Sequence, residues 1–179
     1  MKRSTATLEE QADKAMEAGI KTYEKNNYKK ALDCFSKAMK ISLNLDAPQQ
    51  IAESYERFGL TTFEVLGLEE AMKFLNKALA VRKMLDFFPD ETASTLSSIG
   101  QVHFFSGKLD EALTYYEEAL GIYRGLDSTF TYEVVLTLFI IGKIQSSLGQ
   151  HEKRLNTLKR RWNSRERSTI RNRYSKFFC

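Results

Sequence analysis

The chain has 179 residues, of which 42% are hydrophobic and 28% are charged, a balance that favours a folded protein over disorder throughout. It contains only 2 prolines and 9 glycines, too few for a sheet with many tight turns, so an all-α fold is expected. No apolar run approaches the roughly 20 residues of a membrane span and no secretory signal is visible, so a cytoplasmic protein is expected. The 2 cysteines predict neither a disulfide framework nor a metal cluster.

The charge is divided unevenly along the chain. The formal charge is +4 overall, but residues 151–179 hold ten Lys/Arg against two acids, which leaves residues 1–150 at −4. Because the sequence texture changes at the same point, a boundary is predicted near Gly149. Residues 1–11 are interpreted as a lead-in, residues 12–150 as a repeat array, and residues 151–179 as a degenerate capping helix and basic tail.

Four glycines recur at nearly constant spacing. Gly19, Gly59, Gly100 and Gly142 lie 40, 41 and 42 residues apart. Each of the first three is followed, twelve residues later, by an alanine within the same phrase: a large residue, two polar residues, alanine, an aromatic residue or leucine four positions on, and a second alanine three after that. The phrases begin at Tyr28, Leu68 and Leu109.

Spacings of three and four place the apolar members of this phrase on one face of an α-helix. Each repeat is therefore predicted to be an antiparallel pair, which we name helix A and helix B. A glycine inside a helix costs about 1 kcal/mol relative to alanine, so its recurrence predicts that the two helices cross too closely for a Cβ, with the helix B alanines as partners. The predicted repeats are residues 12–51, 52–92 and 93–134, with a fourth helix A from 135.

The pattern resembles the tetratricopeptide (TPR) repeat, whose helix A carries a small residue and whose helix B carries the alanine, aromatic, alanine series. The long period is similar to that of kinesin light chains and nephrocystin-type proteins, and residues 90–100 are the most similar segment. The resemblance implies a right-handed superhelical solenoid of antiparallel helix hairpins, in which the helices A line a concave groove. The alternative is an unrelated antiparallel helical bundle.

The resemblance also implies which residues face the groove, namely the second, fifth, ninth, twelfth and thirteenth of each helix A. In the first two repeats these are Asp13, Met16, Ile20, Tyr23, Glu24, Glu53, Glu56, Leu60, Phe63 and Glu64. In the last two they are Ser94, Ser97, Gln101, Phe104, Phe105, Leu136, Phe139, Lys143, Ser146 and Ser147.

The N-terminal half of this predicted groove is acidic, with aromatic residues among the acids. We therefore expect a protein partner, a peptide or helix that carries Lys or Arg and a hydrophobic anchor. Two alternatives stay open: the aromatic residues could be buried between helices, and the acids could form an ordinary solvated face.

No catalytic constellation is visible. His103 and His151 lie in different helices, and acid pairs such as Glu69 and Glu70 occupy adjacent helical positions that point apart by about 100°. No phosphate-binding loop and no metal-ligand spacing occur. The sequence predicts no enzyme, no cofactor and no metal.

The C-terminal tail mixes arginines with aromatic residues. Its basic residues include Lys159, Arg160, Arg161, Arg165, Arg167, Arg171 and Arg173. Three interpretations remain: a solvated end, an electrostatic contact with acidic lipid or nucleic acid, or a segment that docks on a partner or on the acidic groove of its own chain. The sequence thus favours a non-catalytic interaction adaptor, with an electrostatic tether based on the tail as the alternative.

Overall fold

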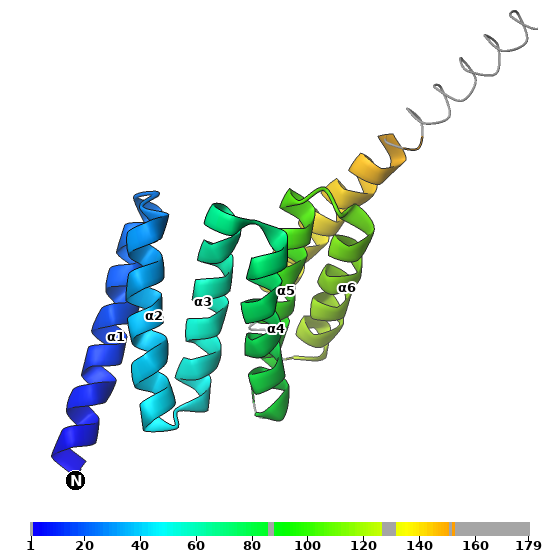
Figure 1. The fold of residues 1–179 in the computed structure, drawn as a ribbon. Coiled ribbons are helices and arrows are strands. Elements are labelled where there is room, and N and C mark those ends of the chain that lie inside the picture. Colours follow the sequence, from blue (N-terminus) through cyan, green and yellow to red (C-terminus); the bar gives the residue numbers. More distant parts are fainter. Residues whose placement is uncertain (1, 86–87, 127–131, 151, 153–179) are drawn as a thin grey trace, which may run out of the picture. The chain divides into compact units, whose positions relative to one another are not determined.

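The computed structural model describes residues 2–85, 88–126, 132–150 and 152. The chain divides into two compact units, Met1–Ile141 and Gly142–Cys179. The named helices all belong to the first unit, and Figure 1 shows them side by side in chain order. They are α1 (Lys2–Glu24), α2 (Tyr28–Leu45), α3 (Pro48–Leu66), α4 (Leu68–Met84), α5 (Pro89–Phe105) and α6 (Leu109–Gly125).

The helices pack as antiparallel hairpins. Helices α1 and α2, α3 and α4, and α5 and α6 form the three pairs, and α2 with α3 and α4 with α5 pack between pairs. Helix α3 also contacts α5, so the helices A of the second and third repeats meet directly. Residues 132–150 are helical as well, and the described residues contain no strand. The predicted all-α array of helix hairpins is confirmed.

The helices A begin earlier than the sequence analysis placed them. Helices α3 and α5 start at Pro48 and Pro89, because proline is suited to the first turn, where no backbone N–H is needed and its φ angle is already helical. Helix α1 starts at Lys2, so the residues assigned to a lead-in continue the first helix. Its first described side chain in the core is that of Ala12, which is 3% exposed.

The turns within the repeats depend on a positive backbone angle. Asn26 has φ 57°, Gly67 has φ 88° and Gly107 has φ 76°. Asparagine and glycine tolerate this left-handed region better than other residues, so the chain can turn between helix A and helix B at all three places.

Three of the recurring glycines form notches that admit a side chain from helix B. A Cβ added at Gly19, Gly59 or Gly100 would lie 2.5 Å from Phe35, 2.9 Å from Leu75 or 3.0 Å from Tyr116, respectively. The close crossing is therefore confirmed, but the nearest atoms belong to the aromatic residue or leucine of the phrase, and the predicted alanine partners were wrong. Burial in this notch raises the pKa of Tyr116 to about 12.

The alanines of the phrase have another role. Ala71 is 0% exposed and clusters with Leu75 of its own helix and with Ile99 and Val102 of the next helix A. A small residue at this position lets consecutive repeats approach closely. Each helix B thus has one face for its own helix A and another for the repeat that follows.

Candidate functional site

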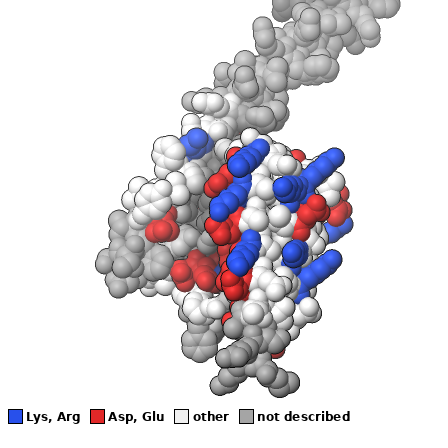
Figure 2. Space-filling view, turned by 90° about the vertical axis from the view of Figure 1, so that its left-hand side faces the viewer, with Lys and Arg blue, Asp and Glu red and all other residues white. Residues whose placement is uncertain are grey.

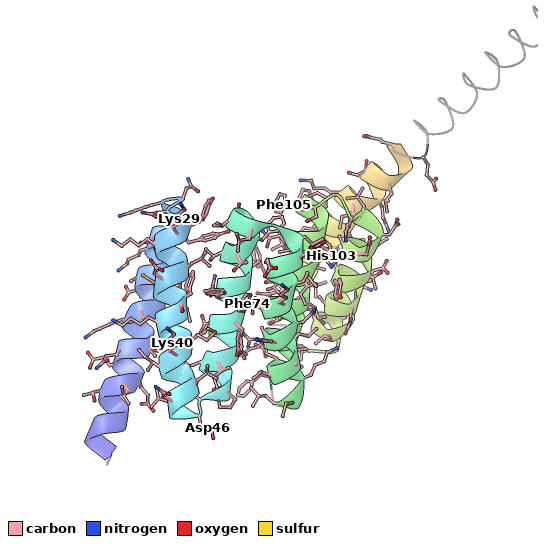
Figure 3. All side chains as sticks on the ribbon, in the orientation of Figure 1. Lys29, Lys40, Asp46, Phe74, His103 and Phe105 are labelled. Atoms are coloured by element: carbon pink, nitrogen blue, oxygen red, sulfur yellow. The ribbon has the colours of Figure 1, made fainter. Side chains whose placement is uncertain are left out.

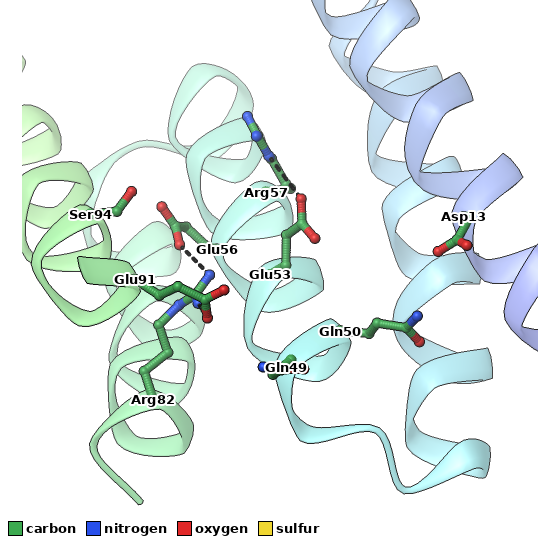
Figure 4. Close-up of a pocket in the computed structure, with 9 residues that line it drawn as sticks. All are labelled: Asp13, Gln49, Gln50, Glu53, Glu56, Arg57, Arg82, Glu91 and Ser94. Atoms are coloured by element: carbon green, nitrogen blue, oxygen red, sulfur yellow. Dashed lines mark hydrogen bonds and ion pairs between the residues drawn. The ribbon is translucent and has the colours of Figure 1, made fainter. Parts of the chain in front are cut away.

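A polar pocket of about 460 Å³ opens between helices of the first three repeats. Helix α1 contributes Asp13, α4 contributes Arg82, and the remaining lining comes from α3 and α5 (Figure 4). The full lining is Asp13, Gln49, Gln50, Glu53, Glu56, Arg57, Arg82, Glu91 and Ser94. Four of these occupy predicted groove positions, namely Asp13, Glu53, Glu56 and Ser94. The structure therefore brings Asp13, Glu53 and Ser94, the second residue of each predicted helix A, together around one pocket.

The inner wall of the pocket is an ion-pair network centred on Glu56. Its Oε2 accepts a hydrogen bond from Nη2 of Arg82 at 3.3 Å and one from Oγ1 of Thr95 at 2.8 Å. Its Oε1 accepts a hydrogen bond from Oγ of Ser98 at 2.6 Å. Glu56 and Arg82 are each only 8% exposed. The Glu56 carboxylate is therefore neutralised within the protein. Glu56 was predicted to face a ligand in the groove, but its charge is already paired.

Arg82 joins three helices. Besides Glu56 on α3, it pairs through Nη1 with Glu91 on α5, while its own backbone belongs to α4. Two carboxylates thus compensate the charge of one buried guanidinium, which is the condition under which a buried charge is tolerated. Its Nε has no hydrogen-bond partner among the described residues. The network therefore fixes the second repeat against the third.

The outer rim of the pocket is less tightly paired. Glu53 lies 3.9 Å from Nε of Arg57, and the two side chains are 45% and 46% exposed, so this contact is weak. Asp13 is exposed, and no ion pair joins it to another described residue. The Oε1 atom of Gln50 is buried and accepts no hydrogen bond within the described part of the chain. The rim thus presents the carboxylates of Asp13 and Glu53 beside the guanidinium of Arg57.

The other predicted groove residues lie outside this pocket. Those that are partly buried are Met16, Ile20, Tyr23, Leu60, Phe63, Ser97, Phe104 and Ser147. Those that are exposed are Glu24, Glu64, Gln101, Phe105, Leu136, Phe139, Lys143 and Ser146. Phe63 and Leu60 pack against the buried cluster that includes Leu75 and Val102. Phe63 is therefore partly buried between helices, which is one of the two alternatives stated for the aromatic residues.

Tyr23 and Glu64 connect the first and second repeats. Burial, followed by the nearby Glu64 carboxylate, raises the pKa of Tyr23. The Tyr23 ring also packs edge-on against Tyr28, with 5.3 Å between centroids. Toward the end of α5, Phe105 is 65% exposed and meets the ring of Phe104 at 5.6 Å, and His103 lies close by (Figure 3). Aromatic surface is thus present at both ends of the predicted groove.

Charges on the outer side of the first repeat largely cancel. Figure 2 shows Lys and Arg interleaved with Asp and Glu on the face formed by this end of the array. On α1, Lys14 pairs with Glu10 and Lys21 with Glu17, both at 2.6 Å. Hydrogen bonds to the lysines, and then their charge, lower the pKa values of these two glutamates. These two glutamates of the outer face are therefore neutralised by lysines of their own helix. The basic-tail residues Lys159 to Arg173 lie outside the described residues.

Arg82, Gln50 and Glu91 were missed by the sequence analysis. A signal for Arg82 was present, because it stands 23 residues after Gly59, where the other two repeats have Ser42 and Tyr123. All three positions are buried. An arginine at a buried repeat position predicts a carboxylate partner nearby, and Glu56 was the candidate.

A family model described as tetratricopeptide repeat matches residues 91–161. Residues 91–161 thus resemble the tetratricopeptide repeat, and the helix hairpins and glycine notches before them follow the same pattern. A comparison with curated protein sequences gave no match. In the described part of the chain, no helix has the length and apolarity needed to span a membrane, and no cluster of side chains there could hold a metal ion.

Solved structures with the same fold share little sequence with this chain. BtubC (BKLC) from P. vanneervenii has a TM-score of 0.69 at 18% identity over 77% of this chain and 56% of its own. A Rap protein complexed with Competence and Sporulation Factor has a TM-score of 0.70 at 18% identity over 81% of this chain and 40% of its own. The first TPR of Spaghetti (RPAP3), bound to the HSP90 peptide SRMEEVD, has a TM-score of 0.53 at 22% identity over 78% of this chain and 94% of its own. The chain thus spans about half the length of the first two.

Proposed function

We propose that the chain is a non-catalytic, cytoplasmic adaptor that binds a peptide or helical segment of a partner protein at the groove face of its helices A. The observation that carries this proposal is the polar pocket of about 460 Å³ in which groove positions from three repeats converge. Two similar structures are complexes, the RPAP3 domain with an HSP90 peptide and the Rap protein with Competence and Sporulation Factor. These complexes support a role in binding peptides or proteins. Which ligand sequence this chain favours is argued from the chemistry of its own pocket.

The rim chemistry favours a cationic side chain in the pocket. Asp13 and Glu53 present carboxylates, and Oε1 of Gln50 is an acceptor without a donor among the described residues. A lysine or arginine supplies several N–H donors and a positive charge, and charge-assisted hydrogen bonds are among the stronger ones. An acidic peptide such as SRMEEVD would instead meet the like charges of Asp13 and Glu53.

A hydrophobic anchor on the same ligand would complete the interaction. Tyr23 and Phe104 are partly buried and Phe105 is exposed, so apolar surface is available beyond the pocket. Aromatic residues of this kind carry much of the binding free energy in protein interfaces, while charged groups set specificity and association rate. The remaining predicted groove positions are proposed as further contacts.

The test is an affinity purification from source lysate, treated with nuclease, that compares variants of the full chain. The double variant Asp13→Asn/Glu53→Gln removes the rim charges, and Glu117→Gln on α6 is the matched control for an exposed acid outside the pocket. The proposal expects partners that the parent and the control retain and the double variant loses. Partners retained equally by all three chains would contradict a role for the pocket.

The alternative function, an electrostatic tether, rests on the net charge of +8 over residues 151–179. It is tested in the same experiment by a variant in which Lys159, Arg160, Arg161 and Arg165 become glutamine. Tail-dependent binding to DNA should fall by about the 0.9 power of salt for every phosphate neutralised, whereas binding anchored by aromatic residues should fall gently. Partners lost from the tail variant and at about threefold physiological ionic strength would favour the tether.

A further inference from the structure

The outer side of α2 carries a row of exposed charged residues. Residues three or four apart on a helix lie on the same side, and those of the row are Lys29, Asp33, Lys37 and Lys40, with Lys30 beside the first of them. Lys29 lies in the first turn of α2 and Lys40 about three turns further on (Figure 3). We name these five residues the α2 row. Four lysines and one aspartate give it a formal charge of +3.

The lysines of the α2 row form no ion pair with another described residue, although ion pairs are common on the neighbouring helices. On α4, for example, Lys73 pairs with Glu70 at 2.5 Å and Lys83 pairs with Glu118 at 3.4 Å. The pairs on α1 join residues of that helix to each other. The positive charge of the α2 row is therefore not compensated by the described part of the chain.

The first turn of α2 has the charge that a helix start disfavours. Residues 69–70 of α4 and 110–111 of α6 are all acidic, and acids interact favourably with the partial positive charge at a helix N-terminus. At the same positions, ten and eleven residues after the recurring glycine, α2 has Lys29 and Lys30 and no acid. These two lysines weaken the start of their own helix. Stability therefore does not explain them, and a role in recognition does.

Asp33 indicates which kind of partner fits the row. It stands four residues from both Lys29 and Lys37, yet no described ion pair joins it to either. A nucleic-acid backbone or an anionic bilayer is negative throughout, so it would meet a like charge at Asp33. A protein segment can instead place a basic residue opposite Asp33 and acidic residues opposite the lysines. Such an arrangement of charges is specific as well as attractive.

An apolar contact is available beside the row. Leu43 stands three residues after Lys40, which makes the two side chains neighbours on the helix surface, and it is 48% exposed. Exposed ion pairs contribute little by themselves, and apolar anchors carry much of the free energy of binding between proteins. Leu43 can serve a protein segment in this way, whereas a phosphate backbone has no apolar group to place against it.

We propose that the α2 row is a second interaction surface, which binds an acidic protein segment with one basic residue opposite Asp33 and an apolar residue beside Leu43. None of the residues that line the polar pocket belongs to α2. A partner on the α2 row therefore leaves that pocket open to the basic segment proposed above. The chain can then join two partners of opposite charge.

The test is a fluorescence anisotropy titration with a labelled peptide of glutamate and leucine that carries one lysine among the glutamates. The variant Lys29→Glu/Lys30→Glu gives α2 the acidic first turn of α4 and α6, so it should keep its melting temperature and yet bind the peptide about fivefold or more weakly. The control Lys73→Glu/Lys108→Glu makes the same change of charge at exposed lysines outside the row and should bind like the parent. The basic residues 151–179 are present in every variant, so their contribution is constant.

A second comparison examines Asp33. The parent should prefer the peptide with lysine to the same peptide with glutamate in its place, and Asp33→Lys should reverse this preference. Binding to a DNA duplex or to phosphatidylserine vesicles should be equal in the two double variants. No binding of the peptide, equal affinity of the two double variants for it, or a loss in Lys29→Glu/Lys30→Glu that is larger for the duplex or the vesicles than for the peptide would overturn the proposal.

Discussion

The inner wall and the outer rim of the pocket use the same residue types for different purposes. On the inner wall, Glu56 is buried and paired with Arg82, Thr95 and Ser98. On the rim, Glu53 has a loose contact at 3.9 Å with an exposed arginine and Asp13 has no ion pair with a described residue. Groove position alone therefore does not decide whether an acid binds a ligand.

The difference shows that residues on other helices can decide the role of a groove residue. Arg82 reaches Glu56 from a different helix, and it satisfies a carboxylate that would otherwise be costly to bury. The rim acids lack such a neighbour and stay solvated. The account thus separates residues that hold the repeats together from residues that are free to recognise a partner.

The largest expected effect comes from breaking the inner network. Arg82→Met keeps most of the side-chain volume but leaves the carboxylates of Glu56 and Glu91 without their buried cation. Removing one member of a buried ion pair costs about 3–5 kcal/mol, so we expect a loss of this size in the free energy of unfolding. Urea denaturation followed by circular dichroism measures it.

The matched control is on the rim. Arg57→Met removes the partner of Glu53, whose contact is exposed, and the expected loss is about 0–1 kcal/mol. Equal losses for the two arginine variants would remove the distinction between wall and rim.

A smaller effect is expected from closing a notch in the helix that carries both regions. In Gly59→Ala the new Cβ would lie 2.9 Å from Cγ and 3.2 Å from the backbone nitrogen of Leu75, and overpacking of this kind costs about 1–3 kcal/mol. Gly121→Ala, where no described atom is within 4 Å, should instead gain about 0.5–1 kcal/mol. A gain in both variants by denaturant titration would mean that the close crossing is unimportant.

His103 gives a contrast with the inner wall, because its buried Nδ1 has no hydrogen-bond partner among the described residues. Its ring stacks on Tyr115 at 5.3 Å, and burial lowers its pKa. A lowered pKa means that the unfolded chain binds the proton more readily, so stability is full above about pH 6.5 and falls as the pH drops below it. His103→Leu should reduce this loss in denaturation curves at about pH 7.5 and about pH 5.5. An unchanged pH dependence would contradict the account.

The smallest change in stability is expected at the rim itself. Asp13→Asn and Glu53→Gln alter exposed or partly exposed groups, so the free energy of unfolding should change by no more than about 0.5 kcal/mol. Thermal and urea denaturation of the two variants check this. A loss of several kcal/mol would place these acids in the structural class with Glu56.

The repeat pattern was sufficient to predict the helix hairpins and the close helix crossings at Gly19, Gly59 and Gly100. The pattern did not predict the helix starts at Pro48 and Pro89. It also predicted an alanine as the residue nearest to each glycine, where the structure has Phe35 or Leu75. Asp13, Glu53 and Ser94, the second residue of each predicted helix A, line one pocket, and their role in binding stays a prediction.

The network around Arg82 could not be read from one repeat. Its partners lie 26 positions before it and 9 after it in the sequence, on two other helices, so neither pair has a helical spacing. Only the packing of α3 against α5 brings Glu56 near Thr95 and Ser98. The residue pattern within one helix predicts which side chains share a face of that helix. Which charged side chains of other helices meet that face depends on how the repeats pack.

The most direct test of the central claim, that the rim acids recognise a cationic segment, is a fluorescence anisotropy titration. The probe is a labelled peptide of serine, lysine and leucine, compared with the same peptide carrying glutamate in place of lysine, against the parent chain, Asp13→Asn/Glu53→Gln and the control Glu117→Gln. The lysine peptide is expected to bind the parent and the control alike. The double variant should bind this peptide about tenfold or more weakly, which is equivalent to about 1.4 kcal/mol. The glutamate peptide should not bind. Equal binding of the two peptides, or unchanged affinity in the double variant, would contradict it.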